Sequence, residues 1–91
     1  MSVRWTSSAH RDLVRLHGFL EDVDRRAAVR VVKLLLAGVK RIARHPRLGV
    51  RLAEFDPREV RKVVVGDYEV RYEVRERDLF VLRIWHAHED R

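Results

Sequence analysis

The stretch VRKVVVGDYEVRYEVRERDLFVLRIW, residues 60–85, decides the fold of this chain. Its first six residues, Val60–Val65, are rich in β-branched side chains, and the glycine–aspartate pair that follows favours a tight hairpin turn. Along Tyr68–Arg75 apolar and charged residues alternate strictly, which predicts a strand with one packed and one charged face. Residues Leu79–Trp85 are apolar on both faces except at Arg83, which is typical of an inner strand. These residues therefore predict an antiparallel meander of three strands.

Two amphipathic helices are predicted before this meander. The first runs from about Ser8 to Glu21, after a cap supplied by Thr6, Ser7 or Ser8. Asp12 is expected in about the first turn, where the helix dipole favours a negative charge. The second follows Asp24 as N-cap and ends at about His45, because Pro46 cannot continue a helix. Its apolar face holds Ala28, Val31, Val32, Leu35, Val39 and Ile42.

The element order predicts an α+β fold, β-α-α-β-β-β, with a helix hairpin packed on one face of a small, mainly antiparallel sheet. Val3–Trp5 is predicted to form an edge strand that joins the sheet, and Val50–Glu59 is predicted to be irregular. The other sheet face, with its charged side chains, is left open. Ninety-one residues suffice for a single domain, residues 1–91, with one modest core.

Composition excludes several classes of protein. The chain has no cysteine, which rules out disulfides and cysteine-held metal centres, and no cofactor is expected. No apolar run approaches the roughly 20 residues of a membrane span, and no apolar segment of a signal peptide follows Met1. We therefore expect a cytoplasmic protein.

The positive charge is concentrated in the middle of the chain. The net charge is +6, and residues 25–66 hold twelve basic against three acidic side chains. Six of these basic residues lie opposite the apolar face of the second predicted helix: Arg26, Arg30, Lys33, Lys40, Arg41 and Arg44. The pattern is typical either of a solvated helix face or of a surface that binds an acidic partner.

Near the end of the last predicted strand lie the residues best suited to chemistry. His86 and His88 point the same way on an extended strand. Each could cap the strand end by packing against the helices, which is the commoner role, or could transfer protons, whereas zinc would need more ligands than these two. Arg83 needs a partner, which Glu69, Glu73 or Asp67 of the neighbouring strand could supply, or it contacts a phosphate or carboxylate of a ligand. Tyr68 and Tyr72 fit the core better than a stacking platform.

The ordered set of motifs resembles the ParE/RelE toxins of type II toxin–antitoxin pairs. The resemblance rests on Trp5-Thr6-x-x-Ala9-x-x-Asp12-Leu13, on His45-Pro46-x-Leu48-Gly49, and on the runs Arg61–Tyr72 and Val81–His88. It covers essentially the whole chain. The family implies the element order given above and a toxin that a cognate antitoxin neutralises by direct binding. The antitoxin is expected to be acidic, to fold on binding, and to use the six basic residues of the second helix.

The family divides by target. RelE-type members cleave mRNA on the ribosome, and this reading would make Arg83, His86 and His88 the candidate catalytic residues. ParE-type members are not nucleases and poison DNA gyrase. Glu69 and His88 replace basic residues of the RelE pattern, and the ending resembles the ParE side. The resemblance thus favours gyrase as target, with Arg83, His86, Glu89, Asp90 and Arg91 as target-binding residues. A third alternative is a non-toxic relative that binds only its antitoxin and operator.

Overall fold

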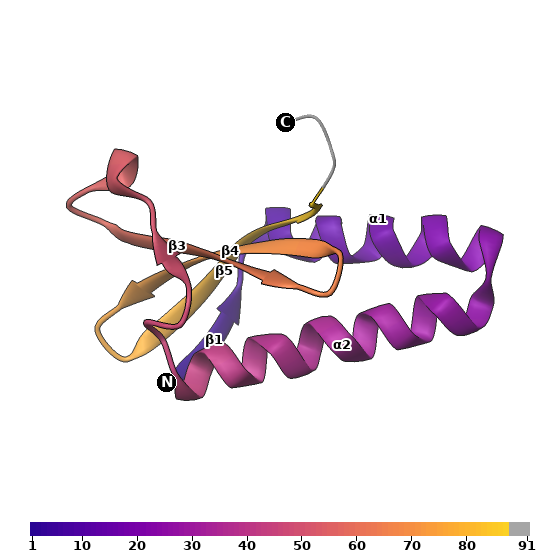
Figure 1. Ribbon diagram of the computed structural model, residues 1–91, viewed down its shortest axis with the longest axis horizontal. Coiled ribbons are helices and arrows are strands. Elements are labelled where there is room, and N and C mark those ends of the chain that lie inside the picture. The colour runs from indigo at the N-terminus through magenta and orange to yellow at the C-terminus, as the bar shows by residue number, and fades with distance from the viewer. Residues whose placement is uncertain (88–91) are drawn as a thin grey trace.

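The computed structural model describes residues 1–87, which form two helices on a five-stranded mixed sheet (Figure 1). The strands follow the order β1-β5-β4-β3-β2; β1 is parallel to β5 and the other pairings are antiparallel. In chain order the elements are β1 (Ser2–Trp5), α1 (Ser7–Val23), α2 (Arg25–Arg44), β2 (Val50–Arg51), a 3-10 helix (Ala53–Phe55), β3 (Glu59–Val65), β4 (Tyr68–Arg75) and β5 (Asp78–His86). The predicted fold class and order are confirmed. The stretch expected to be irregular also contains β2 and the 3-10 helix.

Side-chain caps fix where the two helices begin. Thr6 Oγ1 accepts a hydrogen bond from the backbone N–H of Ala9 at 3.1 Å. Asp24 Oδ1 accepts from the backbone of Arg26 at 3.0 Å and of Ala27 at 3.4 Å. Each cap satisfies backbone donors that a first helical turn leaves without partners.

No helix among the described residues combines the length and apolarity that a membrane crossing requires.

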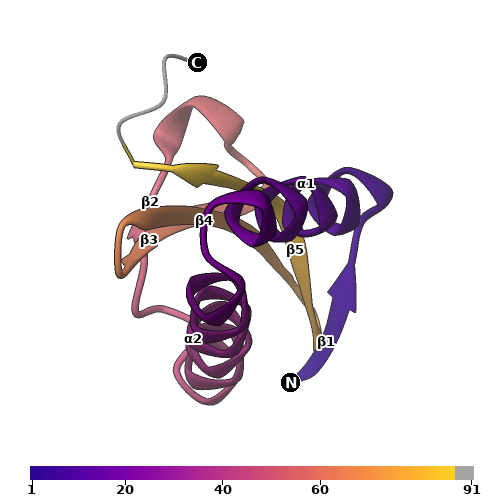
Figure 2. The ribbon, with the colours of Figure 1, turned by 90° about the vertical axis from the view of Figure 1, so that its right-hand side faces the viewer.

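The core lies between the helix hairpin and one face of the sheet (Figure 2). Its fully buried side chains include Leu35 and Ile42 of α2, and Val70, Leu79 and Ile84 of the sheet. The predicted apolar face of α2 therefore has the correct phase. Tyr68 and Tyr72 are buried in the same cluster, as predicted.

The hydroxyl of Tyr72 ties the loop after α2 to the sheet. It accepts a hydrogen bond from the backbone N–H of Gly49 at 2.9 Å and donates to the carbonyl oxygen of Pro46 at 2.8 Å. Burial raises the pKa of Tyr72 above its ordinary value, because the charged phenolate would lose its hydration. The neutral hydroxyl can therefore act as both donor and acceptor.

The opposite sheet face is more covered than the alternating pattern predicts. Glu69 and Glu73, expected to be solvated, are only 5% and 4% exposed. The chain from the 3-10 helix to β3 folds over this face, and Arg58 from that segment binds Glu73 through Nε at 3.1 Å and Nη2 at 2.9 Å. These hydrogen bonds lower the pKa of Glu73. The expectation of an open face was wrong because a loop without periodic patterning provides the cover.

Candidate functional site

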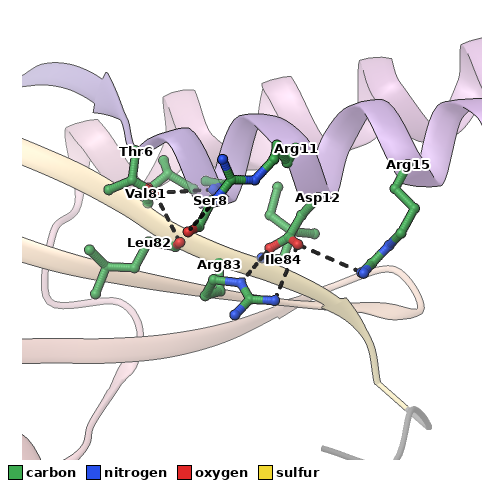
Figure 3. A network of polar contacts seen from close by, with 10 residues as sticks. Thr6, Ser8, Arg11, Asp12, Arg15, Val81, Leu82, Arg83 and Ile84 are labelled. Atoms are coloured by element: carbon green, nitrogen blue, oxygen red, sulfur yellow. Dashed lines mark hydrogen bonds and ion pairs between the residues drawn. The ribbon is translucent and has the colours of Figure 1, made fainter.

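Side chains at the start of α1 form hydrogen bonds with the part of the β5 edge that has no neighbouring strand. The short strand β1 pairs with β5 only as far as Val81, so the following backbone groups of β5 need other partners. Thr6 Oγ1 lies 3.1 Å and 3.0 Å from the carbonyl oxygens of Val81 and Leu82, and the N–H of Ile84 donates to Asp12 Oδ2 at 2.9 Å (Figure 3). The side chains of Thr6, the N-cap of α1, and of Asp12 in its second turn thus bind backbone groups of β5 that have no neighbouring strand.

Arg83 is held by the same carboxylate. Its Nε lies 2.8 Å from Asp12 Oδ2 and its Nη2 lies 3.3 Å from Asp12 Oδ1. The Asp12 side chain is 5% exposed, whereas the Arg83 side chain is 41% exposed. The guanidinium is therefore fixed at its Asp12 side and still reaches solvent.

This pairing corrects two predictions. The partner of Arg83 was expected on the neighbouring strand, but Glu73 binds Arg58 and Glu69 lies 3.8 Å from Arg71. Asp12 was expected to act through the dipole in the first turns of α1, but it lies in the second turn and is buried against β5.

A change of register explains why Arg83 turns towards α1. Tyr72 is paired with Val81 and Arg71 with Arg83, so β5 has one extra residue, Leu82, between the two pairs. Such a β-bulge re-aims the side chains that follow it. The alternation of apolar and charged residues in β4 contains no signal for an insertion in its neighbour.

Two further arginines gather beside this ion pair. Arg15 Nη2 lies 3.6 Å from Asp12 Oδ1, and Arg11 Nη2 lies 3.4 Å from the hydroxyl of Ser8. These residues and Arg83 border a hollow of about 670 Å³, whose lining is Ser8, His10, Arg11, Asp12, Val14, Arg15 and Arg83. We call Arg11, Arg15 and Arg83 the arginine cluster. The sequence analysis missed its two α1 members, for which the available signal was their placement at helical spacing beside Asp12.

His86 lies in a different environment. Its ring meets the ring of Tyr68 edge-on, with centroids 5.4 Å apart. Both residues line an apolar hollow of about 430 Å³ with Leu16, Phe19 and Leu20 of α1. Because Arg83 and His86 are separated by three positions on β5, they point away from opposite faces of the strand. The structure therefore does not bring these two candidate residues together.

The other candidate residues of the C-terminal end, His88, Glu89, Asp90 and Arg91, lie outside the described residues. Within residues 1–87 no group of three or more histidine, aspartate or glutamate side chains is arranged to hold a metal ion.

The basic residues of α2 form an exposed surface, as their position on the helix predicts. All six are exposed: Arg26, Arg30, Lys33, Lys40, Arg41 and Arg44. We call this surface the α2 basic stripe. Arg41 also borders an apolar groove of about 340 Å³ between α2 and β3, with Leu34, Leu48 and Val64 among its lining residues. These three apolar side chains are 44%, 44% and 63% exposed.

The architecture defines a class of protein: small α+β chains in which a helix hairpin covers one face of a mixed sheet and the final strand carries an arginine at its edge. A solved structure described as the chromosomal ParDE TA system from P. aeruginosa has this fold, with a TM-score of 0.78 and 21% identity over 94% of this chain and 95% of that chain. The family described as "ParE toxin of type II toxin-antitoxin system, parDE" matches residues 3–91. The chain therefore belongs to the ParE toxin family. Comparison with curated protein sequences gives no match.

Proposed function

We propose that this ParE-family toxin inhibits DNA gyrase in the cytoplasm and that a cognate antitoxin neutralises it by direct binding. Membership of the ParE family over residues 3–91 supports the assignment. The separation of Arg83 from His86 is the structural observation that favours it over ribosome-dependent mRNA cleavage.

The argument against cleavage concerns geometry. General acid–base catalysis requires a proton-transferring side chain within hydrogen-bond reach of the reacting group, beside a group that stabilises the phosphate. Arg83 is bound to Asp12 at the edge of β5, while the imidazole of His86 contacts the Tyr68 ring on the core side. A single phosphodiester at Arg83 would therefore lie away from the His86 ring. Inhibition of gyrase needs complementary surfaces and no proton transfer.

Purified gyrase provides the direct test. The toxin should inhibit supercoiling of relaxed plasmid and accumulate cleaved gyrase–DNA complexes, while mRNA on translating ribosomes stays whole. Codon-periodic cuts in ribosome-bound mRNA, with supercoiling unaffected, would favour the RelE-type alternative instead.

The His86→Gln variant separates the two mechanisms. A nuclease that used this imidazole would lose about 10²–10⁴-fold in cleavage rate. A gyrase inhibitor should lose activity only as far as ring packing against Tyr68 contributes to the target-binding surface. Antitoxin binding serves as the control for correct folding of the variant.

We propose further that the antitoxin covers the α2 basic stripe and the neighbouring apolar groove. An acidic segment with apolar side chains would match both the positive charge of α2 and the exposed Leu34, Leu48 and Val64. Because long-range charge attraction accelerates association, the on-rate should fall as salt concentration rises. Co-purification and stopped-flow binding measure this, and an on-rate independent of salt would refute the role of the stripe. The double variant Arg30→Gln/Lys33→Gln should lower the on-rate at low salt, whereas Arg4→Gln on β1 should not.

A further inference from the structure

We propose that the arginine cluster, Arg11, Arg15 and Arg83, binds the phosphodiester backbone of a nucleic acid. This contact would give the toxin an affinity for nucleic acid of its own. The inference goes beyond the proposed function, because it concerns the isolated toxin and does not require gyrase to be the target.

The charge balance at the hollow favours an anion. Among the described residues that line it, three carry a guanidinium and one carries a carboxylate, so the lining has an excess of two positive charges. The carboxylate is already engaged, since Asp12 accepts hydrogen bonds from Arg83 and from the N–H of Ile84. A ligand with several negative charges along its length would compensate this excess.

One member of the cluster, Arg83, is also positioned in advance. The other two arginines lie one turn apart on α1, and Arg83 is fixed on β5 by two hydrogen bonds to a buried carboxylate (Figure 3). Because Arg83 is already held in place, it loses less side-chain freedom on binding than a mobile surface arginine does.

Nucleic acid fits this surface better than an acidic peptide. The guanidinium fork matches phosphate and carboxylate oxygens alike in a bidentate geometry, so the aromatic neighbour of the cluster is what favours nucleic acid. Next to the hollow, the Arg83 guanidinium lies 5.1 Å from the centre of the Trp85 ring. Arg71 lies on the other side of this ring, at 4.6 Å, and is held on the covered face by Phe55 at 5.5 Å. Alternation of arginine and aromatic side chains is typical of surfaces that follow a nucleic-acid strand.

The test measures binding of the full-length toxin to labelled DNA of about 20 nucleotides, single-stranded in one arm and duplex in the other. Fluorescence anisotropy is recorded between about 50 and 200 mM salt, because each phosphate contact adds about 0.7 to the logarithmic salt slope for single strands and about 0.9 for duplex. The variant is Arg11→Gln/Arg15→Gln, which leaves the Asp12–Arg83 pair in place. The matched control is Arg30→Gln/Lys33→Gln, which removes the same charge from α2.

Two lost contacts set the expected size of the effect. Over this fourfold range of salt the wild-type affinity should fall about sevenfold more than that of the α1 double variant on single strands, and about twelvefold more on duplex. The control should keep the wild-type slope. The form of DNA that the wild-type toxin binds more tightly at the same salt concentration is the form that the cluster prefers.

Three results would overturn the inference: no binding to either DNA, equal effects of the two double variants, or unchanged DNA binding by an α1 double variant that no longer inhibits gyrase. The last result would assign the cluster to a protein contact. Conversely, a toxin that binds DNA through the cluster and does not affect gyrase would refute the proposed function and leave this inference standing. Thermal unfolding of each variant checks that the fold is retained.

Discussion

Replacing Asp12 by asparagine tests whether one buried carboxylate joins α1 to β5. Asparagine has the same shape, and its amide oxygen can still accept from the N–H of Ile84. Its NH₂ group then faces the guanidinium of Arg83, donor against donor. With the amide oxygen at the Oδ2 position, the variant keeps an acceptor for the N–H of Ile84 and for Arg83 Nε, but this acceptor carries no charge. The 3.3 Å hydrogen bond from Arg83 Nη2 at the Oδ1 position is lost.

The magnitude follows from the burial of the two partners. A hydrogen bond to a charged group contributes about 1.5–3 kcal/mol, and breaking a fully buried ion pair costs about 3–5 kcal/mol. Because the Arg83 side chain is 41% exposed, water can hydrate its guanidinium after the change. The loss of stability should therefore lie in the range of about 1.5–3 kcal/mol for a hydrogen bond to a charged group. We expect Asp12→Asn to lower the free energy of unfolding by about 2 kcal/mol, equivalent to a fall in Tm of about 8–16 °C for a domain of this size.

Urea titration followed by far-UV circular dichroism measures this loss. Arg15→Gln is the control, because Arg15 lies 3.6 Å from the same carboxylate with a side chain that is 58% exposed. Removing so exposed a partner should change stability by no more than about 0.5 kcal/mol. An Asp12→Asn protein within about 0.5 kcal/mol of wild type would refute the reasoning, as would a larger loss in Arg15→Gln.

Three further predictions concern the core and the covered sheet face. Leu35→Ala should lower the free energy of unfolding by about 2–5 kcal/mol, because it leaves a cavity in the core. Arg30→Ala on the exposed face of α2 should lower it by less than about 0.5 kcal/mol. If chemical denaturation ranks the two variants in the opposite order, the predicted phase of α2 is wrong. Tyr72→Phe removes the acceptor of the buried Gly49 N–H and should cost about 1–3 kcal/mol, measured by urea unfolding, with faster hydrogen exchange at Gly49. Glu73 has a folded-state pKa below its unfolded value of about 4.3, so the unfolded chain binds more protons in acid and the stabilising contribution of Glu73 is lost as pH falls through these values. Glu73→Gln should therefore be less stable than wild type at pH 7, and the difference should shrink between about pH 5 and pH 3; a constant difference would exclude the Arg58 contact as its source.

Local patterns in the sequence were sufficient for the elements and for the layer they form. Asp24 caps α2, Pro46 follows its end, and the alternation along Tyr68–Arg75 gives the core face of β4. Gly66 has a φ of 60° and lies in the hairpin turn that the glycine–aspartate pair predicts. Each of these features depends on neighbouring residues alone, because caps, turns and periodicity are short-range properties of the backbone.

The motif Trp5-Thr6-x-x-Ala9-x-x-Asp12 acquires a physical meaning only in the folded chain. Thr6 caps α1 and contacts the β5 carbonyls, Ala9 is fully buried, and Asp12 accepts from Ile84. Asp12 and Ile84 are 72 positions apart, and no local pattern indicates that they meet. The sequence showed that this motif resembles the start of the ParE/RelE toxins. The structure explains why threonine, alanine and aspartate occur at this spacing.

The sequence by itself determined the helix hairpin, the meander and the apolar face on which they meet, because hydrophobic periodicity requires only that one face be buried. Tertiary structure alone decided which charged residues of the sheet pair and which of them are buried. The bulge at Leu82 directs Arg83 towards Asp12, and the loop before β3 brings Arg58 over Glu73. Both outcomes depend on contacts between distant segments, and a buried charge is stable only beside the partner that such contacts provide.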